Sequence, residues 1–538
     1  MKKTDDKTAL LRPSLAIGAV TLLSRLLGLL RVRLEATVLG GGAVASAWFL
    51  AFSIPNLFRR LLGEGALGTA LTPLIATLEK EQGKEEMRHQ LAVIFLALSG
   101  VLALIVIIVS LLALGLLFYG EKYQIPFLTN PRMAMALQLL PLLMPYAFFM
   151  CLVGAATAVL NYVRIFVLPA CGALLLNIFL ISGLAVGWKL RVDMQIPAGG
   201  GLPVFLQVAG GLVLISGICQ LILTLFLLWK SGNYPRWNLA SFRNPEVLRK
   251  LLHLALPGMI AASVLQISFL IDRLLAVKLN DQAVPALTFV DRLVDLPIGL
   301  FAVSLGAVLM AAMSRAAAEK DMEKLREQLL FSLRHVYFVC IPMALAVVVF
   351  HAPLLRVLCL GGNYTEKDLE ATRSVAIFYS AGIPFFCTLK VLLPAFYARK
   401  EMKKPLIASL ISIGTNVVLN LLLMGPLQQG GIALATTVSS ILNNSILLFF
   451  LKKDGVLPPW REFVLTAVRS IFLAGIVMFF LWKIYTVFEK YLTENRWIDA
   501  VGSCLLFSAA GILYIVLSLL VRSPEVKELF AVVRRCQK

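Results

Sequence analysis

Arginine and acidic side chains lie inside several long apolar runs of this sequence. An Arg or Asp at the centre of a membrane helix costs about 2.5–3.5 kcal/mol on insertion scales, so such residues normally face a partner or a water-filled cavity. In the first run, residues 13–37, Ser24, Gly28, Arg31 and Glu35 share one helical face and Arg25 lies beside it. The other intramembrane polar groups are Asn56, Arg59, Arg60 and Glu64 in residues 44–77, Asp272 and Arg273 in 250–278, and Asp291, Arg292 and Asp295 in 284–313.

Positive charges outnumber negative ones among these residues. The count sets Arg25, Arg31, Arg59, Arg60, Arg273 and Arg292 against Glu64, Asp272, Asp291 and Asp295, and the surplus belongs to the N-terminal half. A guanidinium group binds phosphate through two parallel hydrogen bonds and stays charged when buried. The surplus therefore indicates a site for a substrate with a phosphate-bearing head and an apolar tail. The alternative is that pairs such as Arg60 with Glu64, or Arg292 with Asp295, merely hold helices together.

A second polar group contains one carboxylate and three neutral side chains. Its members are Asp272, Asn416, Asn420 and Thr436, which come from three of the apolar runs. Oxygen ligands around one carboxylate suit Na⁺ or a proton. The alternative is that Asp272 pairs with an arginine and the amides hydrogen-bond between helices.

The composition requires a membrane protein to position these residues. Of the 538 residues, 59% are hydrophobic and only 15% are charged, which excludes a soluble globular enzyme. Fourteen apolar runs are long enough to span a bilayer as helices. They lie near residues 13–37, 44–77, 90–119, 134–160, 165–188, 203–229, 250–278, 284–313, 329–350, 372–398, 404–425, 431–451, 463–488 and 498–521. We therefore expect an all-α, polytopic membrane protein.

The net charge of +20 is explained by topology rather than by a nucleic-acid partner. The links before residues 250, 404 and 463 are basic, as is the C-terminal tail, whereas the opposite links at 40–45 and 425–431 carry no charge. The positive-inside rule then predicts that both termini are cytoplasmic.

An internal repeat relates the two halves at a shift of about 236–248 residues. Ser24-Arg25-Leu26-Leu27 resembles Asp272-Arg273-Leu274-Leu275, and Arg88-His89-Gln90-Leu91 resembles Arg326-Glu327-Gln328-Leu329. Parallel repeats of this kind are typical of transporters. We predict two six-helix bundles, residues 1–230 and 231–452, followed by two extra helices and a basic tail in 453–538.

Cysteine and histidine offer no further site. The eight cysteines have no CxxC spacing, and the four histidines have no metal-ligand partner at helical spacing. We therefore expect no disulfide framework and no catalytic metal. Neither a nucleophile nor a metal cluster is evident, which argues against a membrane-embedded enzyme.

Two segments of the first two runs resemble a known family. Ser24-Arg25-Leu26-Leu27-Gly28-Leu29-Leu30-Arg31 and Pro55-Asn56-Leu57-Phe58-Arg59-Arg60-Leu61-Leu62-Gly63-Glu64-Gly65-Ala66 are similar to the opening signature of the MurJ (MviN) family. Val290-Asp291-Arg292-Leu293, Lys390-Val391-Leu392 and Phe396-Tyr397-Ala398-Arg399 are also similar to it. The family flips the peptidoglycan precursor lipid II and belongs to the multidrug/oligosaccharidyl-lipid/polysaccharide exporter superfamily.

The resemblance implies a function and a site. Arg25, Arg31 and Arg292 would point into a central cationic cavity and bind the pyrophosphate, with Ser24, Asn56, Arg59 and Arg60 at further functional positions. Glu64 and Asp291 would lie at a gate. The last two helices would form a hydrophobic groove for the polyprenyl tail.

The resemblance also implies a setting. The protein would move lipid II across the bacterial cytoplasmic membrane by alternating access and would meet membrane lipids and cell-wall synthesis and division proteins. No cofactor is expected, and either the membrane potential or Na⁺ or H⁺ at the Asp272 group would drive the return step. The chain departs from the family pattern at Ser46 and Val32, which puts the outer gate pairing in doubt, and Ser46 is left out of the site. The alternative is a cation-coupled multidrug exporter, or an exporter of another polyprenyl-linked oligosaccharide, of the same superfamily.

Overall fold

The chain is α-helical throughout the part that the structure describes. The computed structural model describes residues 20, 23–63, 66–163, 165, 167–190, 201–236, 246–299, 303–493 and 496–528. Within these ranges there is no named strand, and the one β contact is an isolated bridge between Gly361 and Tyr364. The expected all-α fold is confirmed.

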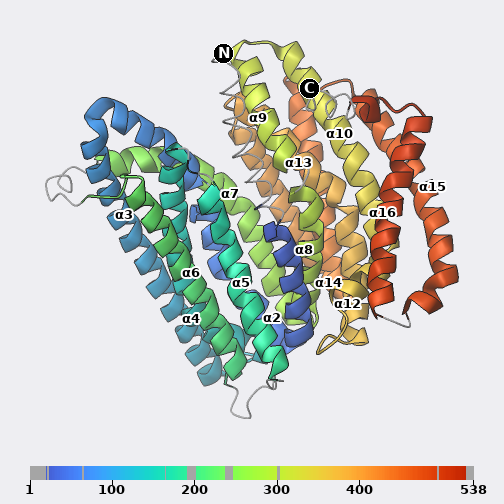
Figure 1. Ribbon diagram of the computed structural model, residues 1–538, viewed down its shortest axis with the longest axis horizontal. Helices are drawn as coiled ribbons and strands as arrows, with labels where there is room; N and C mark the ends of the chain where they lie inside the picture. Colours follow the sequence, from blue (N-terminus) through green and yellow to red (C-terminus); the bar gives the residue numbers. More distant parts are fainter. Residues whose placement is uncertain are drawn as a thin grey trace. The chain divides into compact units, whose positions relative to one another are not determined.

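Long helices make up both parts of the molecule (Figure 1). Residues 23–39 are helical without a label. The labelled elements of the N-terminal half are α2 (Ala43–Phe58), the π-helix η1 (Arg59–Gly63), α3 (Ala66–Tyr123), α4 (Pro131–Tyr162), α5 (Val167–Lys189) and α6 (Val204–Lys230). They are followed by α7 (Glu246–Leu279), α8 (Ala283–Pro297), α9 (Val303–Ala318), α10 (Met322–Val349), α11 (His351–Leu358), α12 (Glu366–Ala381), α13 (Ile383–Ala398), α14 (Lys403–Lys453), α15 (Trp460–Thr493) and α16 (Arg496–Leu520).

Eight described helical stretches are long and apolar enough to cross a membrane. Two of them contain a backbone break, at Gly83 in α3 (φ 84°) and at Gln428 in α14 (φ 48°). Each break falls in a gap between two of the apolar runs seen in the sequence. The protein is therefore a polytopic membrane protein, and the figure of fourteen spans stays a prediction.

Contacts between residues divide the chain into two compact units. The first is Met1–Pro285 with Gly361–Tyr364, and the second is Ala286–Leu360 with Thr365–Lys538. In the first unit α3 packs against α4 and α7, and in the second α10 packs against α13 and α15. The bundle boundaries at residues 230 and 452 rest on the sequence repeat and stay predictions.

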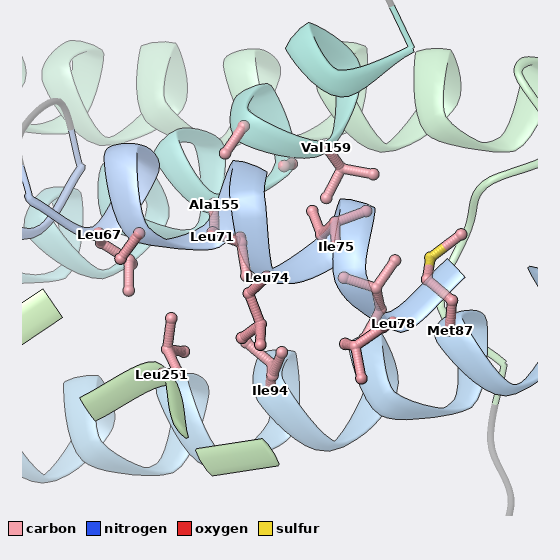
Figure 2. Close-up of a cluster of buried hydrophobic side chains, with 14 of the residues drawn as sticks. Leu67, Leu71, Leu74, Ile75, Leu78, Met87, Ile94, Ala155, Val159 and Leu251 are labelled. Atoms are coloured by element: carbon pink, nitrogen blue, oxygen red, sulfur yellow. The ribbon is translucent and has the colours of Figure 1, made fainter. Parts of the chain in front are cut away.

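The core of the first unit forms where α3 turns back on itself. Leu67, Leu71, Leu74 and Leu78 recur at helical spacing before the break at Gly83, and Ile94 lies after it. Figure 2 shows these side chains together with Ala155 and Val159 of α4 and Leu251 of α7. Since lipid is as apolar as leucine, this close packing rather than escape from water holds the helices together.

The two halves share a backbone irregularity beside their charged residues. In the first half, α2 passes into the π-helical turn η1 at Arg59 and Arg60. In the second half, α8 passes into π-helical residues 298–299 a few residues after Arg292. The number of residues between positions 59 and 298 falls within the shift that relates the two halves of the sequence repeat. The repeat therefore extends to the backbone next to the predicted site. Single π turns occur often at functional sites.

In each half, an arginine of one helix donates a hydrogen bond to the loop that follows another helix. In the first unit Arg88 Nε donates to the carbonyl oxygen of Tyr234 at 3.2 Å, and in the second Arg326 Nε donates to that of Gly455 at 2.7 Å. Gly232 and Gly455, which follow α6 and α14, both have φ of 68°. A left-handed residue there lets the chain leave the helix, a role that favours glycine. The matched contacts support the pseudo-repeat.

The loop between α11 and α12 caps the helix formed by residues 23–39. Asn363 donates its backbone N–H to Thr37 O at 2.9 Å and its side-chain N–H to Val38 O at 2.7 Å. Gly362 has φ of 64°, and a Cβ there would lie 2.3 Å from Thr37 O. These bonds satisfy carbonyl groups that the end of a helix leaves without partners.

Candidate substrate-binding site

Arg31 is buried and bound to polar neighbours of the first unit. Its side chain is 7% exposed, its Nε lies 3.4 Å from Glu35 Oε1, and its Nη1 donates to Asn177 Oδ1 at 3.0 Å. Asn177, on α5, also donates to the backbone oxygen of Ser24 at 3.3 Å. Arg31 and Glu35, which share one helical face, therefore form a buried ion pair. Ser24 is connected to this pair through its backbone oxygen, which accepts a hydrogen bond from Asn177.

Glu35 and Asn177 were not among the predicted site residues. Glu35 lies four residues after Arg31, which is the spacing of a helical ion pair and was visible in the sequence. It reduces the arginine surplus by one charge. Asn177 lies 146 residues away in sequence, and no local pattern points to it.

Arg25 is half-buried and its hydrogen bonding is incomplete, as is that of Arg31 and Arg33 on the same helix. Its Nε is buried and has no hydrogen-bond partner among the described residues. A buried donor left without a partner costs about 1–3 kcal/mol. The Nε–H of Arg25 is therefore suited to donate to an anionic ligand.

The arginines of the second run lie on the π turn. Arg59 Nε donates to Asn56 Oδ1 at 2.9 Å, and Asn56, Arg59 and Arg60 are all half-buried. Asn56 thus orients Arg59 within one turn of helix. The gate residue Glu64 lies outside the described residues, so its predicted pairing with Arg60 stays a prediction.

The charged residues of α7 and α8 fall in different units. Asp272 and Arg273 are buried in the first unit, where Arg273 Nη1 donates to Val284 O at 3.4 Å. Asp291 and Arg292 are half-buried in the second unit, and Asp295 is exposed. Convergence of Arg292 with the arginines of the first unit stays a prediction.

The three neutral residues of the predicted cation site form a chain of hydrogen bonds in α14. Asn420 Nδ2 donates to Asn416 Oδ1 at 3.1 Å, Asn416 Nδ2 donates to Thr436 Oγ1 at 3.2 Å, and Thr436 Oγ1 donates to Ile432 O at 3.0 Å. The bonds join the two segments of α14 across its break at Gln428. Asp272 belongs to the first unit, so the four-residue cation site stays a prediction.

Ser46, the departure from the family pattern, has a structural role. It is fully buried, and its Oγ donates to the backbone oxygen of Asp281 at 2.6 Å. The Asp281 carboxylate lies 3.1 Å from Arg132 Nε. The buried hydroxyl of Ser46 is therefore satisfied by a backbone carbonyl. Val32, the other departure, is buried in the core.

Comparison with known proteins settles the family. The model of the family described as "Lipid II flippase MurJ" matches residues 35–504. The chain belongs to the MurJ family. A protein of Vibrio cholerae named "Probable lipid II flippase MurJ" is 31% identical over 488 residues, covering 89% of this chain and 90% of the relative. The "Lipid II flippase MurJ" of Burkholderia cenocepacia is 29% identical over 487 residues, covering 87% and 89%.

Solved structures show the same fold. One described as "Lipid II flippase MurJ, inward closed conformation" superposes with a TM-score of 0.73 at 24% identity, covering 94% of this chain and 98% of the other. An inward-facing multidrug resistance MATE family transporter of the MOP superfamily has a TM-score of 0.62 at 14% identity, covering 80% and 97%. The MurJ family consists of transporters, so this chain is a multi-pass membrane transporter and not an enzyme.

Proposed function

We propose that this protein moves lipid II from the cytoplasmic to the periplasmic leaflet of the bacterial inner membrane. Membership of the MurJ family supports this proposal, since its relatives are named as lipid II flippases. The transport cycle is alternating access, in which the two pseudo-repeated halves rock about a binding site. Both termini lie in the cytoplasm, as the basic links predict. Proteins of cell-wall synthesis and division are the partners that this substrate suggests.

Recognition of the pyrophosphate is the task of Arg25, Arg31 and Arg292. The observation that carries this assignment is Arg25, whose buried Nε has no hydrogen-bond partner among the described residues. Arg31 has five N–H groups, and its hydrogen bond to Asn177 uses one of them, so others remain for an anion. A diphosphate offers the oxygens that planar guanidinium groups bind in pairs.

Release requires that these contacts weaken in the outward-open state. A cation at Asp272, Asn416, Asn420 and Thr436, either Na⁺ or H⁺, or the membrane potential would drive the return. Glu64 and Asp291 act at the gate beside the cavity. No further cofactor is required by this scheme.

The test is complementation of a strain depleted of its own lipid II flippase. Arg25→Ala should lower lipid II translocation at least tenfold and fail to support growth, because it removes the unpaired donor. Arg25→Lys keeps the charge but not the planar fork and should fall between Arg25→Ala and wild type. Lys230→Gln, which removes an exposed charge at the end of α6, is the matched control.

The readout is the accessibility of the lipid II headgroup at the outer face of the depleted cells, with protein levels measured in parallel. Full rescue by Arg25→Ala would contradict the proposed binding role. Drug resistance conferred without any rescue of wall synthesis would favour the cation-coupled multidrug exporter instead.

A further inference from the structure

A groove that is not lined by any of the proposed substrate-binding residues lies between α3 and α7 in the first unit. It has a volume of about 600 Å³, within the range of ordinary ligand sites. Its lining residues are Pro73, Leu74 and Thr77 of α3 and Glu246, Arg249, Lys250, His253 and Leu254 of α7. The groove is therefore apolar on the α3 side and basic along the first turns of α7.

One positively charged side chain of this groove has no acidic partner among the residues that the structure describes. Lys250 Nζ lies 3.1 Å from Glu246 Oε1, so these two residues compensate each other. Arg249 is exposed and forms no hydrogen bond or ion pair with any other residue that the structure describes. His253 adds a ring nitrogen on the same side. The net positive charge suits a ligand with one negative charge.

The surroundings of the groove place that ligand in the membrane. Leu252, Leu254 and Leu256 are each exposed by half or more of their surface. The opposite side of α7, with Val247, Leu251 and Ala255, is buried in the core shared with α3 (Figure 2). Exposed leucines beside basic residues occur where a helix passes from hydrocarbon to headgroups. The positive-inside pattern predicts that α7 begins at the cytoplasmic leaflet.

We infer that this groove binds an anionic glycerophospholipid of the inner leaflet. The phosphate contacts Arg249, with Lys250 and His253 beside it, and an acyl chain lies against Pro73, Leu74 and Leu254. A free phosphate ion would leave the apolar wall of the groove uncovered, and a zwitterionic lipid would leave the charge of Arg249 unbalanced. Binding there would add a contact between the two helices that enclose the groove.

Lipid titration of the purified full-length protein tests this inference. Phosphatidylglycerol and phosphatidylcholine with identical acyl chains are added to the protein in detergent, and bound lipid is counted by native mass spectrometry. We expect phosphatidylglycerol to bind at least fivefold more tightly. Arg249→Gln should abolish most of this preference, since one basic residue near an anionic lipid contributes about fivefold in affinity. Lys230→Gln, which removes an exposed charge that does not line the groove, should leave the preference unchanged.

A second variant tests the groove by shape alone. Thr77→Trp places an indole in the groove from the α3 side and keeps every charge, so it should lower phosphatidylglycerol binding while the circular dichroism spectrum stays unchanged. Equal affinity for the two lipids in wild type would overturn the inference, as would unaltered binding in Thr77→Trp or an equal loss in Lys230→Gln.

Arg25→Ala separates this site from the proposed transport site. We expect that variant to keep its affinity for phosphatidylglycerol, whatever it does to lipid II. A loss of phosphatidylglycerol binding in Arg25→Ala would place the lipid in the substrate site and overturn the inference. Failure of the transport proposal would leave the lipid titration unaffected.

Discussion

At the scale of single residues, the intramembrane arginines differ in how they are satisfied. Arg31 has Glu35 as an ion-pair partner and donates to Asn177 through Nη1, although its Nε forms no hydrogen bond, whereas for Arg25 the Nε is buried without any partner in the described structure. Arg59 is oriented by Asn56 within one turn. The arginines of the first two helices therefore differ in their local partners. In the proposed site, Arg31 would hold the helix and offer N–H groups, and Arg25 would contact the anion directly.

The buried pair of Arg31 and Glu35 predicts a specific double-mutant cycle. Glu35→Gln should lower the free energy of unfolding by about 3 kcal/mol, because it leaves a buried arginine without its carboxylate. Adding Arg31→Gln to that variant should recover part of the loss. Equilibrium unfolding in mixed micelles measures both changes.

The matched control for this cycle is Glu246→Gln, which removes the acid of an exposed pair at the same helical spacing. A change of no more than about 0.5 kcal/mol is expected there. Equal changes in the free energy of unfolding for Glu35→Gln and Glu246→Gln would show that burial does not increase the contribution of the first pair to stability.

At the scale of elements, the segment after α16 is fixed to α10 and α15 by one carboxylate. Glu525 is fully buried and accepts hydrogen bonds from Arg334 of α10 at 3.0 Å and from Thr466 of α15 at 2.8 Å. Arg469 of α15 is a third partner. Val526 beside it is buried against Phe338 and Leu473. These contacts fix the segment after α16 to α10 and α15 within the second unit.

The surroundings of Glu525 predict a pH dependence of stability. Burial alone would raise the pKa of its carboxyl, but its hydrogen bonds and the charge of Arg469 lower that pKa below its ordinary 4.5. A lowered pKa in the folded state means that the stabilisation is complete above about pH 5 and is lost as the pH falls through the folded value. The midpoint of thermal unfolding should therefore drop between pH 5 and pH 3.

The control for this prediction is Glu525→Gln, which removes the titrating group. It should be less stable than wild type at pH 7, and the difference between the two proteins should shrink toward pH 3. A difference that stays constant over this range would show that the charge of Glu525 does not contribute.

At the scale of the whole molecule, two pseudo-repeated halves carry the same devices. Each half has an arginine that binds a carbonyl oxygen at or just after a left-handed glycine, and each has a π turn next to charged residues. Parallel repeats share one orientation in the membrane. The arginine contacts of both halves should therefore face one compartment, and corresponding π turns should lie at the same depth in the membrane.

That expectation predicts how single cysteines react in intact cells. In a background that lacks the native cysteines, Leu427→Cys should react with a membrane-impermeant maleimide, because residues 425–431 form an uncharged link. Lys453→Cys should react only after the cells are opened, because its link is basic. Labelling of Lys453→Cys in intact cells would reverse the proposed orientation and, with it, the leaflet to which lipid II is delivered.

Local patterns were sufficient for the class of fold and for much of the candidate site. Unbroken apolar runs can cross a bilayer only as helices, since every backbone group must find its partner within its own segment. The helical spacing of Arg31 and Glu35, and of Asn56 and Arg59, likewise depends on neighbours within one or two turns. These features were open to prediction because they need no information about distant parts of the chain.

Other features were decided only by the tertiary structure. Asn177 reaches Arg31 across 146 residues, and Asn363 caps residues 37–38 across more than 300. How many of the Arg31 N–H groups are bonded depends in part on Asn177. The groove between α3 and α7 exists because the core brings together residues that no periodic pattern relates. Sequence alone therefore determined which helices form and which charges they carry, and tertiary packing decided which distant groups become partners of those charges.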